Sequence, residues 1–91
     1  AGAVIDMQPD EIITIGSSAY EANIVLPVPE VSWTHCTIRY DVRSEQYIVE
    51  DISSNGTFLG DGTRLLKDEQ TILPRGTILY ISDIENAFKL I

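Results

Sequence analysis

Apolar and polar residues alternate strictly over residues 36–42, and this alternation constrains the fold more than any other feature of the chain. In the run Cys-Thr-Ile-Arg-Tyr-Asp-Val, every second residue is apolar. Successive side chains of a β-strand point to opposite faces, so a period of two predicts a strand with one buried face. A helix would scatter the same apolar residues around its axis. The chain must therefore contain a sheet that packs on a core.

Further strands are expected on both sides of this one, because short apolar runs recur between turn residues. We expect them at 12–15, 23–26, 47–52, 58–59, 63–65, 77–81 and 88–91. The Asp61-Gly62 pair is a signal for a tight hairpin. A helix over 68–73 is the one alternative to strand, and it is too short to change the fold class. Short strands separated by turns indicate a β-sandwich, so we predict one all-β domain over residues 1–91.

Composition narrows the possible partners. One cysteine and one histidine cannot form a disulfide or a zinc cluster, so we expect no metal and no cofactor. The net charge of −8 disfavours nucleic acid and anionic membrane, which both need a basic surface. All basic residues lie at Arg39 or later. A protein is therefore the expected partner.

The chain lacks the sequence marks of a membrane or secreted protein. No apolar run approaches the roughly 20 residues of a membrane-spanning helix, and no signal-peptide pattern opens the chain. We expect an intracellular, cytoplasmic protein with no membrane contact through this domain. We also expect the chain to be a domain excised from a longer protein.

Two polar motifs stand where loops meet strands. They are Val-Ser-Trp-Thr-His at 31–35 and Asp-Ile-Ser-Ser-Asn-Gly-Thr at 51–57. The hydroxyls of Ser32 and Ser54 can donate hydrogen bonds to a phosphate, and Asn55 carries both a donor and an acceptor for a peptide main chain. Each motif also has a plain interpretation, because Ser and Asn-Gly commonly stabilise turns without any ligand.

The order of these motifs resembles the forkhead-associated (FHA) domain family, whose members bind phosphothreonine peptides. The similarity runs from about Ile12 to Phe88 and includes Ile-Gly at 15–16, Asn-Ile-Val-Leu at 23–26, both polar motifs, and Gly-x-x-Leu at 62–65. The resemblance implies a sandwich of two twisted antiparallel sheets, with the recognition loops together at one end.

The resemblance also implies roles for individual residues. Ser32 corresponds to the residue whose hydroxyl contacts the phosphate, Ser54 to a second hydroxyl or backbone contact, and Asn55 to the residue that holds the main chain of the peptide. His35 resembles a buried histidine that braces the Ser32 loop. The positions expected to support the loops are Gly16, His35, Gly56 and Thr57.

Two positions depart from the family pattern. Ser17 stands directly after Gly16, where the family has its phosphate-binding Arg, and Trp33 takes a place that often holds Arg or Lys. Gly-Ser with otherwise matching loops is similar to the FHA-type domain of zeaxanthin epoxidases, which would imply a plastid or cyanobacterial protein. Two roles are open for Trp33, an exposed anchor for a partner or a cap on the sandwich. Arg39 is the nearest basic residue in sequence that could replace the missing one.

Two functions follow from these features. The first is phosphothreonine-peptide recognition with weakened phosphate binding, because loss of a hydrogen bond to a charged group forfeits about 1.5–3 kcal/mol. The second is a degenerate FHA scaffold used for phosphate-independent protein binding or assembly.

Ser32, His35 and Asp51 supply the residue types of a hydrolase triad. However, no G-x-S-x-G elbow is present, so we expect no enzyme.

Overall fold

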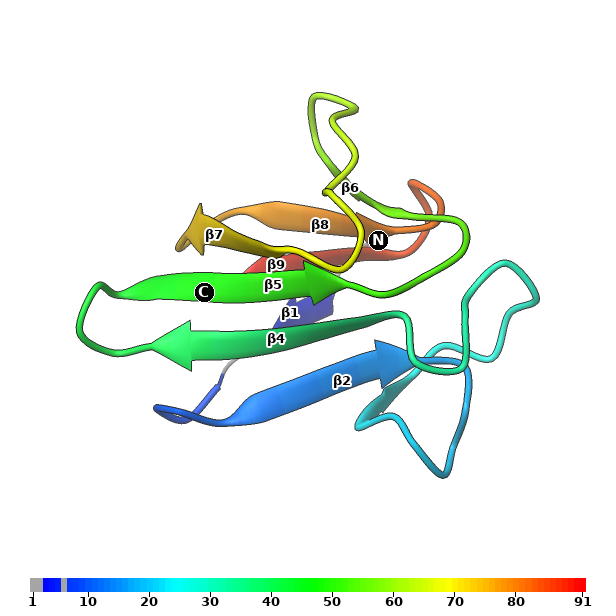
Figure 1. Ribbon diagram of the computed structural model, residues 1–91, viewed down its shortest axis with the longest axis horizontal. Helices are drawn as coiled ribbons and strands as arrows, with labels where there is room; N and C mark the ends of the chain where they lie inside the picture. The colour runs from blue at the N-terminus through cyan, green and yellow to red at the C-terminus, as the bar shows by residue number, and fades with distance from the viewer. Residues whose placement is uncertain (1–2, 6) are drawn as a thin grey trace.

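The computed structural model describes residues 3–5 and 7–91, and this part of the chain forms nine strands (Figure 1). The strands are β1 (Ala3–Ile5), β2 (Ile12–Gly16), β3 (Ile24–Val25), β4 (Cys36–Asp41), β5 (Gln46–Asp51), β6 (Thr57–Leu59), β7 (Gln70–Pro74), β8 (Ile78–Ile81) and β9 (Ala87–Leu90). Within the described residues, no helix is long and apolar enough to cross a membrane.

The strands form two sheets that pack face to face, which confirms the predicted all-β sandwich. One sheet has four strands in the order β1-β9-β8-β6, and the other has five in the order β3-β2-β4-β5-β7. Most neighbours are antiparallel, but β1 lies parallel to β9 and β3 parallel to β2. In each parallel pair, a short strand lies at the edge of its sheet. The two sheets are therefore mainly antiparallel, whereas purely antiparallel sheets were expected.

The segment 68–73 does not contain the short helix that the sequence allowed. Residues 70–74 form β7, which pairs antiparallel with β5 from Gln70 opposite Glu50 to Pro74 opposite Gln46. Leu73 is buried in the core, whereas its neighbour Ile72 points outward and is 61% exposed. Side chains that point alternately to the two faces are typical of a strand. The sequence does not show this pattern here, because two adjacent residues are both apolar although they lie on opposite faces.

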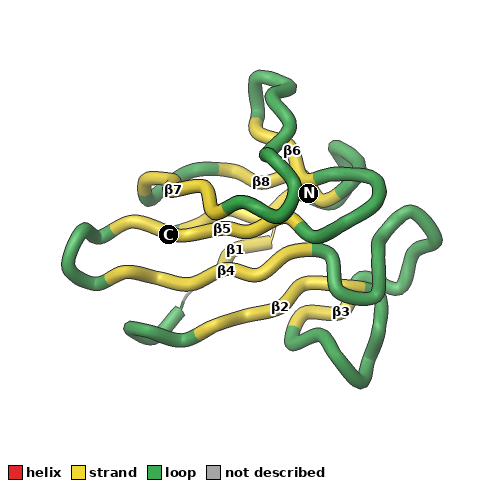
Figure 2. Tube along the Cα trace, in the orientation of Figure 1, coloured by secondary structure: helices red, strands yellow, loops and turns green. Residues whose placement is uncertain are grey.

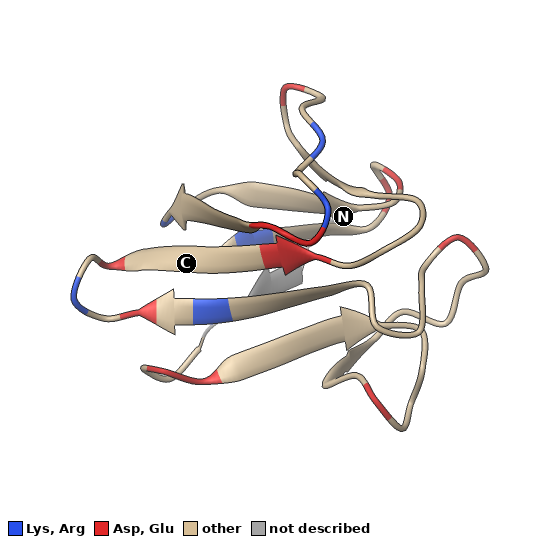
Figure 3. Ribbon diagram, viewed as in Figure 1, with Lys and Arg blue, Asp and Glu red and all other residues tan. Residues whose placement is uncertain are grey.

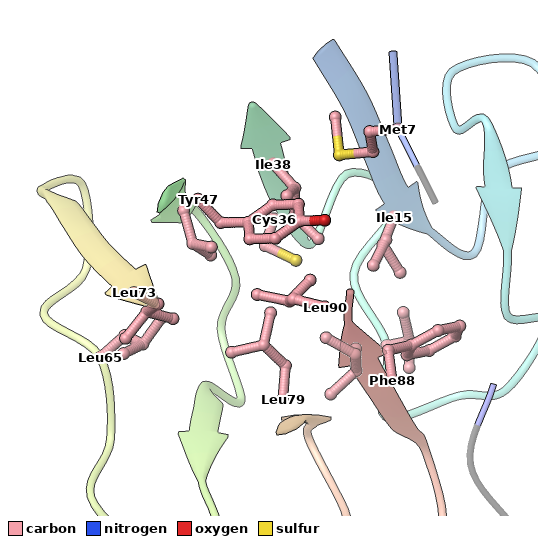
Figure 4. Close-up of a cluster of buried hydrophobic side chains, with 13 residues drawn as sticks. Met7, Ile15, Cys36, Ile38, Tyr47, Leu65, Leu73, Leu79, Phe88 and Leu90 are labelled. Carbon is pink, nitrogen blue, oxygen red and sulfur yellow. The ribbon is translucent and has the colours of Figure 1, made fainter. Parts of the chain in front are cut away.

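The core between the sheets is built from alternate residues of the facing strands (Figure 4). Cys36 and Ile38 of β4 point inward, as the alternation over 36–42 predicted. The opposite sheet contributes Leu79 and Ile81 of β8. Burying one such aliphatic side chain contributes about 1.5–3 kcal/mol, so this cluster supplies the main stabilisation of a small domain.

Four loops gather at one end of the sandwich, where β2 and β5 end and β4 begins (Figure 2). We call this region the loop end, and it comprises residues 17–23, 26–35, 52–56 and 82–86. The segment 26–35 is called the Ser loop and the segment 52–56 the Asn loop. Both flank the β4–β5 pair, so the best-paired strands of the domain position the candidate site.

Candidate functional site

The Ser loop lies directly on Gly16, the last residue of β2. The Ser17 N–H donates to the Ser32 carbonyl over 2.9 Å, and the Ser18 N–H donates to the Trp33 carbonyl over 3.3 Å. A Cβ atom on Gly16 would lie 1.9 Å from the Trp33 carbonyl oxygen. Any larger residue at this position would push the Ser loop away, so Gly16 allows the two segments to meet.

His35 connects the Ser loop to the Asn loop from inside the protein. Its side chain is fully buried. Its Nδ1 accepts from the Ser32 N–H at 3.2 Å, and its Nε2 lies 2.7 Å from the Gly56 carbonyl oxygen. Because Nδ1 is an acceptor, the proton of the neutral ring is on Nε2 and is donated to Gly56. Desolvation lowers the pKa of His35, although the hydrogen bond to Gly56 opposes this effect.

The Asn loop folds around the buried carboxylate of Asp51. One oxygen of this carboxylate accepts from the backbone N–H and hydroxyl of Ser53, at 3.2 and 2.6 Å, and from the Thr57 hydroxyl at 3.1 Å. The Ser53 hydroxyl in turn accepts from the Gly56 N–H at 2.8 Å. Gly56 has a φ of 99°, a left-handed conformation that favours glycine. These contacts fix the shape of the loop before any ligand arrives.

The structure brings Ser32, Ser54 and Asn55 together at the loop end. The Ser54 N–H donates to the Ser32 hydroxyl oxygen over 3.2 Å, and the Asn55 side-chain amide donates to the Glu30 carbonyl over 2.7 Å. The Ser32 hydroxyl proton, the Ser54 hydroxyl and the second amide hydrogen of Asn55 are therefore available to a ligand. The three residues therefore lie next to one another at the loop end.

Two further predicted site residues flank this group. Ser17 is partly exposed and lies beside Ser32 through the backbone hydrogen bond described above. Trp33 is 73% exposed and projects from the Ser loop, and Tyr20 in the neighbouring loop is completely exposed. Trp33 therefore does not cap the sandwich, and the interpretation as a cap is wrong.

The residue types of a hydrolase triad are not arranged as one. Both ring nitrogens of His35 are hydrogen-bonded to backbone atoms, so the imidazole is not available as a base for the Ser32 hydroxyl. Burial raises the pKa of the Cys36 thiol to about 12, which leaves it an inert core residue. In the described part of the chain, no group of His, Cys, Asp and Glu side chains is placed to hold a metal ion.

A basic residue that contacts the site is Arg64, which the sequence interpretation missed. Its Nη2 donates to the Ser54 carbonyl over 3.3 Å. Arg39, the candidate suggested by sequence distance, instead lies on the outer face of the five-stranded sheet, between Ile12 and Ile48 in register. The Asp61-Gly62 turn was a usable signal, because a tight hairpin there pairs Arg64 with Phe58, two residues from Gly56.

The charge of the loop end is acidic (Figure 3). None of the four loops contains Lys or Arg, whereas they carry Glu21, Glu30, Asp83 and Glu85. Arg75 lies in the turn between β7 and β8 and forms an exposed ion pair of 3.8 Å with Glu45 of the β4–β5 turn. Arg64 thus stands out as a cation beside an otherwise acidic set of loops.

Comparison with known proteins identifies the domain type. The family model described as FHA domain matches residues 13–82. Among solved structures, the MEK1 FHA domain in complex with a phosphothreonine peptide of HOP1 superposes with a TM-score of 0.74 and 28% identity. That match covers 86% of this chain and 79% of the MEK1 chain. No curated protein matches the sequence.

Two further structures support the same fold. The FHA domain of an Arabidopsis thaliana hypothetical protein has a TM-score of 0.72 and 25% identity, over 87% of this chain and 65% of that one. The N-terminal FHA domain of S. cerevisiae RAD53P, in complex with a phosphothreonine peptide, has a TM-score of 0.67 and 21% identity. The matched region is 85% of this chain and 62% of the RAD53P chain.

Proposed function

The chain belongs to the FHA domain family, and we propose that it is a protein-interaction module that binds phosphothreonine-containing peptides at the loop end. FHA domains are interaction modules, and the MEK1 and RAD53P domains bind phosphothreonine peptides. The observation that carries the proposal is the hydrogen bond from the Ser54 N–H to the Ser32 hydroxyl. It joins the two loops that hold the available donors, so a single phosphate can contact both.

Each side chain then has a distinct task. The hydroxyls of Ser32 and Ser54 donate to phosphate oxygens, and Asn55 uses its remaining amide hydrogen and its carbonyl for the main chain of the peptide. The loops are held in place by Gly16, His35, Gly56 and Thr57. Trp33 and Tyr20 offer exposed aromatic surface to the peptide side chains.

Phosphate binding is weakened in this proposal, because Ser17 carries no charge. An Arg can bind two phosphate oxygens at once through its planar fork, which a serine hydroxyl cannot do. Loss of a hydrogen bond from a charged group costs about 1.5–3 kcal/mol, which is roughly a tenfold or greater loss of affinity. The domain should therefore prefer phosphorylated peptides less strongly than the same domain with an Arg at position 17.

The test compares each phosphothreonine peptide of a library with its unphosphorylated twin by calorimetric or fluorescence titration. We expect the wild-type protein to prefer the phosphorylated peptide, and Ser17→Arg to increase that preference by about tenfold. Ser44→Arg is the matched control, because it adds the same charge in the β4–β5 turn, away from the loop end. A preference that Ser44→Arg raises as much as Ser17→Arg would show that only net charge matters.

A phosphate-independent interaction domain is the second candidate function, and exposed apolar side chains favour it. Trp33 is 73% exposed, and Ile84 in the 82–86 loop is 78% exposed. Equal binding of both peptides by the wild-type protein and by Ser17→Arg would select this function over the first. Trp33→Ala should then abolish binding, since buried tryptophans dominate protein interfaces.

A further inference from the structure

A phosphate dianion needs positive charge at its binding site, and this domain offers little of it. The first 38 residues contain no Lys or Arg, so neither the Ser loop nor the 17–23 loop supplies a cation. Four acidic residues surround the site in the neighbouring loops. Neutral hydroxyls and amides would have to bind the phosphate against this negative field without a cation to offset it.

Arg64 is held against the Asn loop by its backbone and by its side chain. Its backbone bridges to Phe58 of β6, which places it opposite the strand that leaves the Asn loop. Its Nη2 donates to the Ser54 carbonyl over 3.3 Å. Burial of the ring is the main cause of the lowered pKa of His35, and the positive charge of Arg64 lowers this pKa further. The guanidinium therefore lies within electrostatic reach of both recognition loops.

Gly56 leaves room for this arginine. A Cβ atom on Gly56 would lie 2.8 Å from the Arg64 Nε and 2.9 Å from the Phe58 Cζ. The missing side chain thus lets the guanidinium lie directly over the backbone of the Asn loop. A left-handed φ explains why glycine is favoured at this position, and the approach of Arg64 gives a second, independent reason.

Most of the hydrogen-bonding capacity of Arg64 is available. A guanidinium has about five N–H donors in a fixed fork, and one of them is used on Ser54. The residue is exposed, so the remaining donors face solvent at the edge of the site. They lie next to the residue whose N–H binds the Ser32 hydroxyl. Ser54 thus links Arg64 to Ser32, because its carbonyl accepts from Arg64 and its N–H donates to the Ser32 hydroxyl.

We propose that Arg64 supplies the positive charge for the phosphate, in place of the arginine that Ser17 lacks. It reaches the phosphate from the side of the Asn loop instead of from the end of β2. This inference rests on the proposed function, because it names the cation of the same site. Two other basic residues fit less well. Arg39 lies on the outer face of a sheet, and Arg75 is engaged in an ion pair at the opposite end.

The experiment compares Arg64→Gln with Arg39→Gln, which removes the same charge from the outer sheet face. Both variants and the wild type are titrated with a phosphothreonine peptide and its unphosphorylated twin. Arg64→Gln should reduce the preference for the phosphorylated peptide by about tenfold, and Arg39→Gln should change it by less than about twofold. Arg64→Lys should retain part of the preference, because it keeps the charge without the planar fork.

The outcomes separate the role of Arg64 from the function of the domain. An unchanged preference in Arg64→Gln overturns the assignment of Arg64 and leaves phosphopeptide binding intact. Equal weakening of both peptides, with a lower melting temperature, also overturns it, since Arg64 would then only clamp the Asn loop. If the wild type has no phosphate preference, Arg64 does not supply the charge. In that case, a preference that appears in Ser17→Arg shows that the pocket itself is functional, and its absence refutes the proposed function.

Discussion

Replacing His35 by Ala should destabilise the domain and loosen mainly the Ser loop. The imidazole is fully buried and makes two hydrogen bonds, one from the Ser32 N–H and one to the Gly56 carbonyl. The Gly56 carbonyl would keep a partner, because it also accepts from the Ser82 N–H at 3.0 Å. The Ser32 N–H would lose its acceptor, so the damage falls mainly on the Ser loop.

The size of the effect follows from these two contacts. Leaving the Ser32 N–H without an acceptor costs about 1–3 kcal/mol, and losing the bond to Gly56 costs about 1 kcal/mol more. We expect a total loss of about 2–4 kcal/mol in the free energy of unfolding. For a domain of this size, 1 kcal/mol corresponds to about 4–8 °C in melting temperature. The melting temperature should therefore fall by at least ~8 °C.

Thermal unfolding followed by circular dichroism measures this change, and hydrogen exchange at the Ser32 amide localises it. Asn23→Ala is the control, because it removes one exposed hydrogen bond of 2.8 Å to the Thr14 N–H. It should cost less than about 1 kcal/mol. An unaltered melting temperature in His35→Ala would refute the reasoning that this histidine holds the two loops together.

Three further predictions concern pH, backbone packing and peptide charge. Because the pKa of His35 is lowered from its ordinary value of 6.5, its contribution to stability is present above pH 6.5. That contribution is lost as the pH falls below this value, and melting curves should show no such loss in His35→Ala. Gly16→Ala should abolish peptide binding, since its Cβ would meet the Trp33 carbonyl at 1.9 Å. Gly62→Ala is the control, because residue 62 lies in an open turn with a φ of 90°. This variant should strain only that turn, and titration should show unchanged peptide binding. Lysines flanking the phosphothreonine should strengthen binding by about 0.2–1 kcal/mol per pair with the acidic loops, and fluorescence titration at high salt should show this gain removed.

The sequence was sufficient to predict the fold because the central strands have one apolar and one polar face. Residues 36–42 alternate strictly, and the observed β4 buries Cys36 and Ile38 as that pattern requires. The strand β7 was not predicted as one. Ile72 and Leu73 are adjacent apolar residues on opposite faces of an edge region, and only the pairing with β5 decides which of them is buried.

The site was predictable where its residues lie in local motifs and unpredictable where it depends on contacts between segments. The Ser and Asn loops each appear as a short run of polar residues, so Ser32 and Asn55 could be singled out. Arg64 belongs to neither run, and its proximity to Ser54 results from the hairpin that follows β6. Arg39 is nearer to the Ser loop in sequence, but strand alternation turns it to the outer face of the sheet.

The central claim is that a phosphothreonine peptide binds across the joined Ser and Asn loops. Its most direct test is a titration of the isotope-labelled domain with such a peptide, followed by backbone amide chemical shifts. The amides of Ser32, Ser54 and Asn55 should shift most, and the unphosphorylated twin should shift them less at the same concentration. Largest shifts around Ile12 and Ile48, on the outer face of the five-stranded sheet, would contradict the claim, as would identical shifts with both peptides.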